Sequence, residues 1–226
     1  MKIENENIFC MHTGVLGVNT YIILLDQKTA AIIDPGGNAE KIYAFLKEKN
    51  ANLDAILLTH THFDHIGAVA PLKKQFPNAK IFCHNAEKHF LGKNALQNQL
   101  KCFCDGGMEN FIKESVENNM PEIDVALNGG EILFQNSENF LNGFKVLHTP
   151  GHSEGSICFY NEKTNVLFSG DTLFCGTWGR TDFAGGSETK MKKSLETLLK
   201  LPKQTQVFPG HMNFTTIFAE KGLLQY

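Results

Sequence analysis

Arginine is almost absent from this sequence. Of 21 basic residues only Arg180 is an arginine, and 24 acidic residues bring the formal net charge to −3. The calculated isoelectric point is about 6.3. Proteins that bind DNA or RNA usually carry clustered basic residues and have isoelectric points above about 9. Nucleic acid is therefore not an expected partner.

Long apolar runs are missing as well. No stretch approaches the roughly 18 apolar residues of a membrane-spanning helix, and residues 1–7 contain acids where a secretory signal needs an apolar run. We expect a cytoplasmic protein without a membrane partner. No low-complexity linker interrupts the sequence, so a single domain over residues 1–226 is expected.

The six cysteines are expected to be free thiols rather than disulfides. A chain of 226 residues can bury an adequate core without cross-links, and no secretory signal is present. Cys102 and Cys104 have one residue between them, whereas zinc knuckles usually have two or more. This pair is a weak signal for a metal.

Short apolar, β-branched runs alternate with amphipathic segments along the chain. Helices are expected after Asn38, over 66–75, over 84–91 and after Ser187. The runs predict strands at 21–25, 30–33, 53–58, 80–83, 131–134, 144–147, 156–160, 166–168 and 206–208. Two β-rich halves, each followed by helices, predict an α/β (α+β) fold in which two sheets pack face to face with helices outside.

Residues 92–121 differ in kind from the rest, being rich in Asn, Lys and Glu with two consecutive glycines. We expect a partly helical insertion that acts as a mobile lid over the site and influences substrate range.

A cluster of metal-ligand side chains follows the predicted strand 53–58. His60, His62, Asp64 and His65 place three imidazoles and a carboxylate within six positions. Imidazole and carboxylate suit zinc and other first-row metals. Side chains two apart in an extended segment point the same way, so His60 and His62 could bind one ion while Asp64 and His65 face another. The alternative is a polar loop before a helix with Asp64 as its N-cap.

Three further polar turns follow predicted strands downstream. They contain His152, Asp171 and His211, each directly after a glycine, which lets the backbone turn tightly beside a site. Each turn alone is weak support for a site. Their occurrence in this order after the histidine cluster predicts one metal-binding constellation.

These motifs resemble those of the metallo-β-lactamase-fold hydrolases, and within them the compact bacterial, glyoxalase II-like (hydroxyacylglutathione hydrolase-like) branch. The resemblance spans nearly the whole chain and rests on Thr59-His60-x-His62-x-Asp64-His65, Thr149-Pro150-Gly151-His152-Ser153, Gly170-Asp171-Thr172, Gly179-Arg180-Thr181-Asp182-Phe183 and Pro209-Gly210-His211. It implies an αββα four-layer sandwich with a dinuclear metal site along the sheet edge.

The resemblance also implies a ligand set and a reaction. A first ion would be held by His60, His62 and His152, a second by Asp64, His65 and His211, and Asp171 would bridge them. Zinc is the expected metal, with iron or manganese as alternatives. The implied activity is hydrolysis of a thioester or ester, such as S-lactoylglutathione, by a hydroxide bridging the two ions. Asp64 and Asp171 would be the catalytic carboxylates.

Other family members fit the sequence less well. Flavodiiron proteins carry a glutamate where His62 stands, and secreted β-lactamases lack the bridging Asp171. RNA-processing relatives add long RNA-grasping elements and basic surfaces that are not found here. A persulfide dioxygenase, with a mononuclear iron site on two histidines and an aspartate, stays open as the alternative function.

The sequence departs from glyoxalase II after the last motif. That family continues Gly-His with Glu-Tyr-Thr, whereas Met212, Asn213 and Phe214 stand here, and only 15 residues follow His211. Recognition of glutathione is therefore not implied, and the oligomeric state is not indicated.

The remaining candidates have a structural and a functional interpretation. An ion pair of Arg180 with Asp182 is favoured over a substrate contact. Trp178 and Cys175 are candidates for the wall of a substrate pocket, with packing equally favoured. His148 is interpreted as a structural neighbour of the ligands, and His84 as a packing or capping residue.

Overall fold

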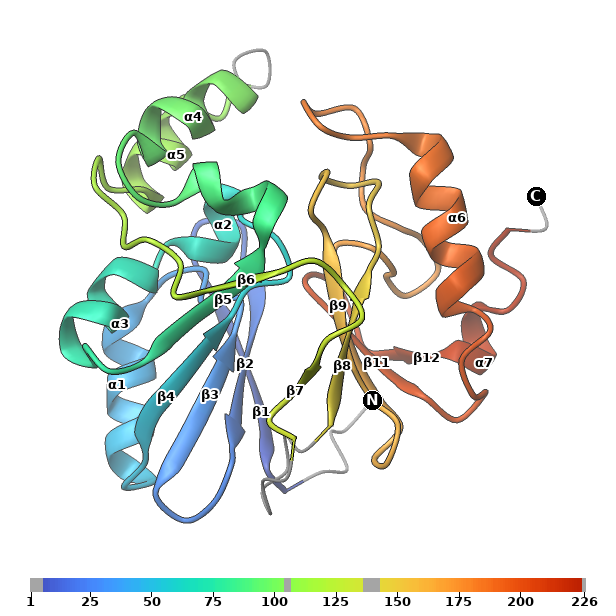
Figure 1. Ribbon diagram of the computed structural model, residues 1–226, viewed down its shortest axis with the longest axis horizontal. Helices are drawn as coiled ribbons and strands as arrows, with labels where there is room; N and C mark the ends of the chain where they lie inside the picture. Colours follow the sequence, from blue (N-terminus) through green and yellow to red (C-terminus); the bar gives the residue numbers. More distant parts are fainter. Residues whose placement is uncertain (1–5, 104–106, 136–142, 225–226) are drawn as a thin grey trace. The chain divides into compact units, whose positions relative to one another are not determined.

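The computed structural model describes residues 6–103, 107–135 and 143–224. Its contacts divide the chain into two compact units, Lys2–Ala126 and Leu127–Tyr226. Each unit is built around one six-stranded sheet with helices (Figure 1). The predicted mixture of α and β structure with two sheets is confirmed, whereas a single domain with a lid stays a prediction.

The N-terminal sheet has the strand order β1-β2-β3-β4-β5-β6. Its strands are β1 (Ile8–Thr13), β2 (Val18–Leu24), β3 (Thr29–Ile33), β4 (Asn52–Leu57), β5 (Lys80–His84) and β6 (Val125–Leu127). The first three strands are antiparallel, whereas β3, β4 and β5 run parallel. Parallel strands need crossover connections. These contain α1 (Ala39–Glu48), between β3 and β4, then α2 (Phe63–Ile66) and α3 (Val69–Gln75), between β4 and β5.

The predicted insertion follows β5. It begins after the 3₁₀ helix η1 (Asn85–Phe90) and contains α4 (Ala95–Cys102) and α5 (Glu109–Ser115). Its two ends meet, because the N–H of Gly92 donates to the carbonyl of Pro121 over 3.2 Å. Residues 92–121 are therefore an excursion from the sheet with a closed base, and they are partly helical as predicted.

The C-terminal sheet has the order β12-β11-β10-β9-β8-β7. Its elements are β7 (Ile132–Leu133), β8 (Phe144–His148), β9 (Ile157–Asn161), β10 (Val166–Gly170), α6 (Glu188–Leu198), β11 (Gln206–Pro209), β12 (Thr215–Thr216) and α7 (Ile217–Glu220). Strands β7 to β10 are antiparallel neighbours, and α6 connects the parallel pair β10 and β11.

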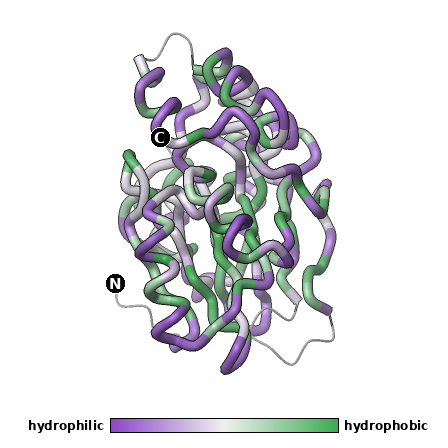
Figure 2. Tube along the Cα trace, turned by 90° about the vertical axis from the view of Figure 1, so that its left-hand side faces the viewer, coloured by the Kyte–Doolittle hydropathy of each residue, from purple (hydrophilic) through white to green (hydrophobic). Residues whose placement is uncertain are grey.

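Apolar periodicity explains where the helices pack. Met191, Leu195 and Leu198 lie on one face of α6 and are buried in a cluster with the C-terminal sheet, and the side chain of Ser187 caps the helix by accepting from the N–H of Lys190. Figure 2 shows that hydrophobic and hydrophilic segments alternate along the chain, as the periodicity of these elements requires.

Some elements differ from the sequence prediction. Residues 66–75 were expected to be one helix, but α2 and α3 are separate because the backbone leaves helical geometry before Val69. Asn38 does precede α1, yet its carboxamide oxygen accepts from the N–H of Gly14 instead of capping the helix. Strands β1, β6 and β12 were not predicted.

The topology places polar turns at one edge of each sheet. In the N-terminal sheet, β3 and β4 are parallel with Ile33 opposite Leu57, so the residues that follow them emerge at the same edge. In the C-terminal sheet, β8, β10 and β11 run in one direction, and Gly170 lies opposite Pro209. Chain segments that leave the carboxyl ends of such strands are the usual location of sites in α/β proteins.

Candidate metal centre

The loop after β4 brings four sequence-predicted ligands of the N-terminal unit together. His60, His62, Asp64 and His65 are all buried, with exposed fractions between 0 and 6%. The ring centroids of His60 and His62 lie 4.6 Å apart, and those of His60 and His65 lie 4.0 Å apart. Isolated polar side chains are costly to bury. Their concentration here indicates a site rather than a polar loop with an aspartate cap, and Asp64 lies inside α2 rather than at its N-cap.

Asp34 is a buried carboxylate beside the ligand loop that the sequence reasoning missed. It follows β3, is 1% exposed, and accepts from the N–H and hydroxyl of Thr59 over 2.8 and 2.6 Å. Its Oδ2 lies 3.1 Å from Nδ1 of His65. Such a carboxylate fixes the tautomer and ring orientation of a metal-binding histidine.

The missed residue had a signal in the sequence. Asp34 was interpreted as part of the turn Asp34-Pro35-Gly36-Gly37, but it ends a strand adjacent to the one that precedes the histidine cluster. Ligand-type atoms of Asp34, His60 and His65 lie within 4.8 Å of one another. Because the oxygens of Asp34 already meet Thr59 and His65, we interpret it as the group that orients His65.

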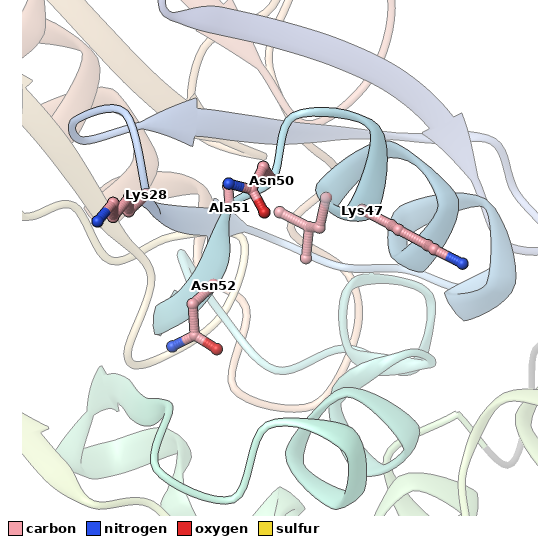
Figure 3. Close-up of a pocket in the computed structure, with 6 residues that line it drawn as sticks. Lys28, Lys47, Asn50, Ala51 and Asn52 are labelled. Atoms are coloured by element: carbon pink, nitrogen blue, oxygen red, sulfur yellow. The ribbon is translucent and has the colours of Figure 1, made fainter.

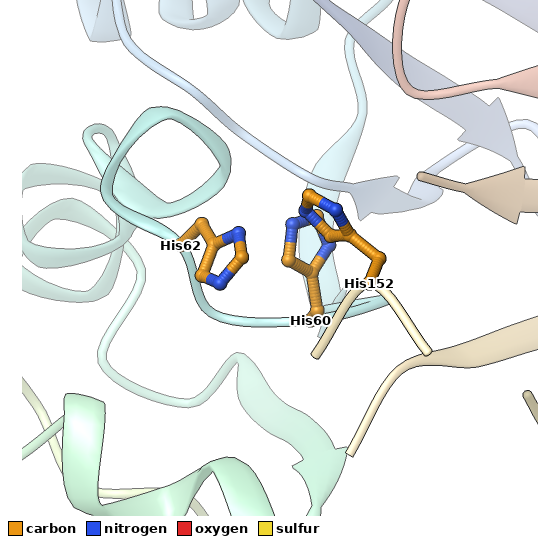
Figure 4. A group of neighbouring side chains, drawn as sticks. All are labelled: His60, His62 and His152. Atoms are coloured by element: carbon orange, nitrogen blue, oxygen red, sulfur yellow. The ribbon is translucent and has the colours of Figure 1, made fainter. Parts of the chain in front are cut away.

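The C-terminal unit gathers the other three predicted ligands. His152 follows β8, Asp171 follows β10 and His211 follows β11. Oδ2 of Asp171 lies 3.6 Å from Nε2 of His152 and 3.7 Å from Nε2 of His211. Figure 4 shows His152 on the loop after β8, and His60 and His62 on the loop after β4.

These separations fit metal ligands better than hydrogen bonds. An N–H···O bond has a donor–acceptor distance of roughly 2.7–3.2 Å. Two donor atoms each about 2.1 Å from one ion, at a tetrahedral angle, lie roughly 3.4 Å apart. The Nε2 to Oδ2 distances at Asp171 agree with atoms that could share an ion, and the donor set of imidazole and carboxylate fits divalent metals.

The loop containing Gly179 and Arg180 holds His152 in position. The imidazole Nδ1 of His152 lies 2.8 Å from the carbonyl oxygen of Arg180, the geometry of an N–H that donates to this carbonyl and leaves Nε2 toward Asp171. A Cβ at Gly179 would lie 2.0 Å from the carbonyl oxygen of Asp171 and 3.1 Å from Nδ1 of His152. Only glycine fits there.

The three predicted substrate contacts lie on the same loop. Arg180 is exposed and forms a bidentate ion pair with Asp182, at 2.7 and 2.6 Å. Hydrogen bonding to Arg180 lowers the pKa of Asp182 to about 2. Trp178 is half-buried against the C-terminal core cluster, and Cys175 is an exposed free thiol. The ion pair was the favoured interpretation, and substrate contacts for these residues stay a prediction.

The neighbouring histidines have structural contacts. Nδ1 of His84 accepts from the N–H of Ala86 over 3.2 Å and so caps η1, which confirms its interpretation as a capping residue. His148 is exposed, with Nε2 3.1 Å from the carbonyl oxygen of Glu154.

A pocket in the N-terminal unit lies away from the ligand loop. It is lined by Lys28, Leu46, Lys47, Asn50, Ala51 and Asn52 (Figure 3). Asn52 begins β4, whereas His60 follows the end of that strand. Because a strand rises about 3.3 Å per residue, the two ends of β4 lie roughly 17 Å apart, with the pocket at one end and the ligand loop after the other.

A search against protein-family models matches residues 13–211 to the metallo-beta-lactamase superfamily. The chain belongs to this superfamily. The match covers every predicted ligand from His60 to His211. It confirms the resemblance and the fold class that the motifs implied.

Curated members of the superfamily align over nearly their full length. Hydroxyacylglutathione hydrolase GloC of Haemophilus influenzae is 37% identical over 90% of this chain and 89% of the relative. The probable metallo-hydrolase YqgX of Bacillus subtilis is 35% identical over 93% of this chain and 92% of the relative. These superfamily relatives support the expectation of a metal-dependent hydrolase with a small-molecule substrate.

Two solved structures extend the comparison. The BLEG-1 B3 metallo-beta-lactamase has a TM-score of 0.79 at 36% identity and covers 94% of this chain and 95% of its own. TTHA1623 in a di-iron-bound form has a TM-score of 0.77 at 34% identity and covers 94% of this chain and 96% of its own. The histidine and aspartate clusters described above could hold such divalent metals in this superfamily member. No helix among the described residues is long and apolar enough to cross a membrane.

Proposed function

We propose that this protein is a dinuclear, metal-dependent thioesterase of the glyoxalase II-like type. His60, His62 and His152 would hold one ion, Asp64, His65 and His211 would hold the other, and Asp171 would serve both. The 37% identity with hydroxyacylglutathione hydrolase GloC supports this class of substrate.

The position of Asp171 is the observation that carries the proposal. Its Oδ2 is nearly equidistant from His152 and His211, which the proposal assigns to different ions. A mononuclear site needs about three protein ligands and a water. A carboxylate between histidines of two ligand sets supports a shared bridge instead.

Zinc is the first metal to test, and iron is the second. The donor set of imidazoles and carboxylates accepts either, and a relative with 34% identity carries two irons. When bound, two such ions would polarise a thioester carbonyl and lower the pKa of a water molecule between them.

The protein's own groups prepare the ligands for that chemistry. Oδ2 of Asp34 faces Nδ1 of His65 over 3.1 Å, and the carbonyl oxygen of Arg180 accepts from Nδ1 of His152. Both contacts favour Nε2 of these histidines as the atom that would coordinate an ion. Burial of the loop residues keeps bulk water from competing as a ligand. A thiolate leaves readily, so the proposal requires no protein acid to protonate it.

Substrate contacts are proposed for the loop of Cys175, Trp178 and Arg180. These side chains are exposed or half-buried, and they follow Asp171 within nine residues of the sequence. They can therefore contact a ligand without unfolding the core. A cytoplasmic location stays a prediction from the sequence.

A substrate panel tests the proposed reaction. Protein loaded with zinc, or with ferrous iron, is mixed with S-lactoylglutathione, with a thioester lacking glutathione, with a chromogenic cephalosporin, and with glutathione persulfide under an oxygen electrode. We expect thioester hydrolysis to have the highest kcat/KM. Faster β-lactam hydrolysis, a possibility raised by the 36% identity with a B3 enzyme, or oxygen uptake with persulfide would overturn the proposal.

A further inference from the structure

A buried hydrogen-bond network fixes the residue between the first two histidine ligands. Thr61 is fully buried, and its N–H and hydroxyl lie 3.1 and 2.7 Å from Oε2 of Glu87 in η1. Its carbonyl oxygen accepts from Nε2 of Gln99 in α4 over 2.5 Å. Glu87 and Gln99 are 1% and 0% exposed.

This network restrains both peptide units that separate His60 from His62. The N–H of Thr61 belongs to the first of these peptide groups and its carbonyl to the second. Each peptide group therefore has one hydrogen bond to a side chain from outside the loop. Planar peptides leave two soft dihedrals per residue. Fixing both planes therefore fixes the distance and direction between the two histidine backbones.

The ring of His62 is restrained from the same helix. Phe103 follows the last turn of α4 and is 3% exposed. Its ring meets that of His62 edge-on, with centroids 4.9 Å apart and an interplanar angle of 78°. Phe103 lies four residues after Gln99 and eight after Ala95, which is also fully buried, so one face of α4 packs against the ligand loop.

We propose that Gln99 and Phe103, with Glu87, are positioning residues that set the affinity of the ion held by His60 and His62. The proposal rests on the dinuclear site proposed above, and it gives the insertion 92–121 a function in metal retention. Groups that orient metal ligands typically change metal affinity by about 10–100-fold when they are replaced.

Two substitutions on the inner face of α4 test the proposal. Gln99→Met removes the donor to Thr61 at similar size, and Phe103→Leu removes the aromatic edge while the site stays apolar. Zn²⁺ affinity is measured for both sites by competition with a chromogenic chelator. We expect one of the two dissociation constants to rise about 10–100-fold and the other to stay within about threefold of the wild type.

Matched controls separate positioning from folding. Gln97→Met changes the same residue type on the exposed face of α4, and Phe111→Leu does so on α5, where Phe111 is 41% exposed. Both should bind two ions as the wild type does. Phe103→Tyr keeps the aromatic ring and should keep the wild-type affinity.

The outcomes distinguish this inference from the proposed function. Wild-type affinities in Gln99→Met and Phe103→Leu, with or without a lower melting temperature of the metal-free protein, overturn the inference while thioesterase activity stands. If the wild type binds two ions but hydrolyses no thioester, the substrate proposal fails and the inference stands. If Phe103→Leu does not fold, Gln99→Met decides alone.

Discussion

At the scale of single residues, substitution of Asp171 is expected to have the largest effect on turnover. Its carboxylate would neutralise charge between two cations, so Asp171→Ala should reduce turnover by about 10²-fold or more, comparable to the loss of other electrostatic support of a transition state. The measurement is kcat at saturating metal. Asp171→Asn, which keeps the shape without the charge, is the control. An alanine variant with full metal and wild-type turnover would remove Asp171 from the mechanism.

Asp182 gives a prediction that does not depend on metal. Hydrogen bonding to Arg180 lowers its pKa from the ordinary value of 3.8 to about 2. A depressed folded-state pKa means that the ion pair is present above the ordinary value and is lost as pH falls toward 2. An NMR titration of the Asp182 carboxyl should show the low pKa, and Arg180→Gln should raise it toward 3.8. An unchanged pKa in Arg180→Gln would contradict the pairing.

The residues with the strongest chemical signature were also the most predictable. Histidines and aspartates after the strands stood out by type and spacing, and the family resemblance implied which of them are ligands. Asp34 was not recognised because a lone aspartate beside a Pro-Gly-Gly turn is usual turn chemistry. The contacts of Gln99 and Phe103 could not be predicted, since nothing in their own sequence indicates which loop α4 packs against.

At the scale of elements, the loop containing Gly179 should tolerate no side chain. The added methyl group of Gly179→Ala would lie 2.0 Å from the carbonyl oxygen of Asp171, so the backbone between His152 and Asp171 must move. We expect lower metal content by elemental analysis and lower activity. Gly222→Ala is the control, because its Cβ would meet nothing within 4 Å. Equal metal content in both variants would show that the loop can relax without disturbing the ligands.

Strands and helices were predictable where burial imposes a pattern. β9 and β10 are mostly apolar, buried runs, and α6 repeats its leucines at helical spacing. β1 alternates little in hydropathy, and β12 has two residues, so neither gives a periodic signal. The insertion 92–121 was predicted to be polar and partly helical, but the sequence did not reveal that one face of α4 is buried.

At the scale of the whole molecule, family membership and fold agree with the sequence reasoning over residues 13–211. The fold was predictable because two β-rich halves alternate with helices and because the motifs that contain the ligand-type residues resemble those of a known family. The identity of the substrate was not predictable, because side chains that contact a substrate are exposed and carry no periodic or ligand-type signature. Cys175, Trp178 and Arg180 can be assigned only by kinetics.

The most direct test of a dinuclear thioesterase is a titration of the metal-free protein with metal, followed by its rate of S-lactoylglutathione hydrolysis. We expect the rate to rise until two equivalents of zinc or ferrous iron are bound per chain, and then to stay constant. A plateau at one equivalent, or no thioester hydrolysis at any metal content, would contradict a dinuclear thioesterase.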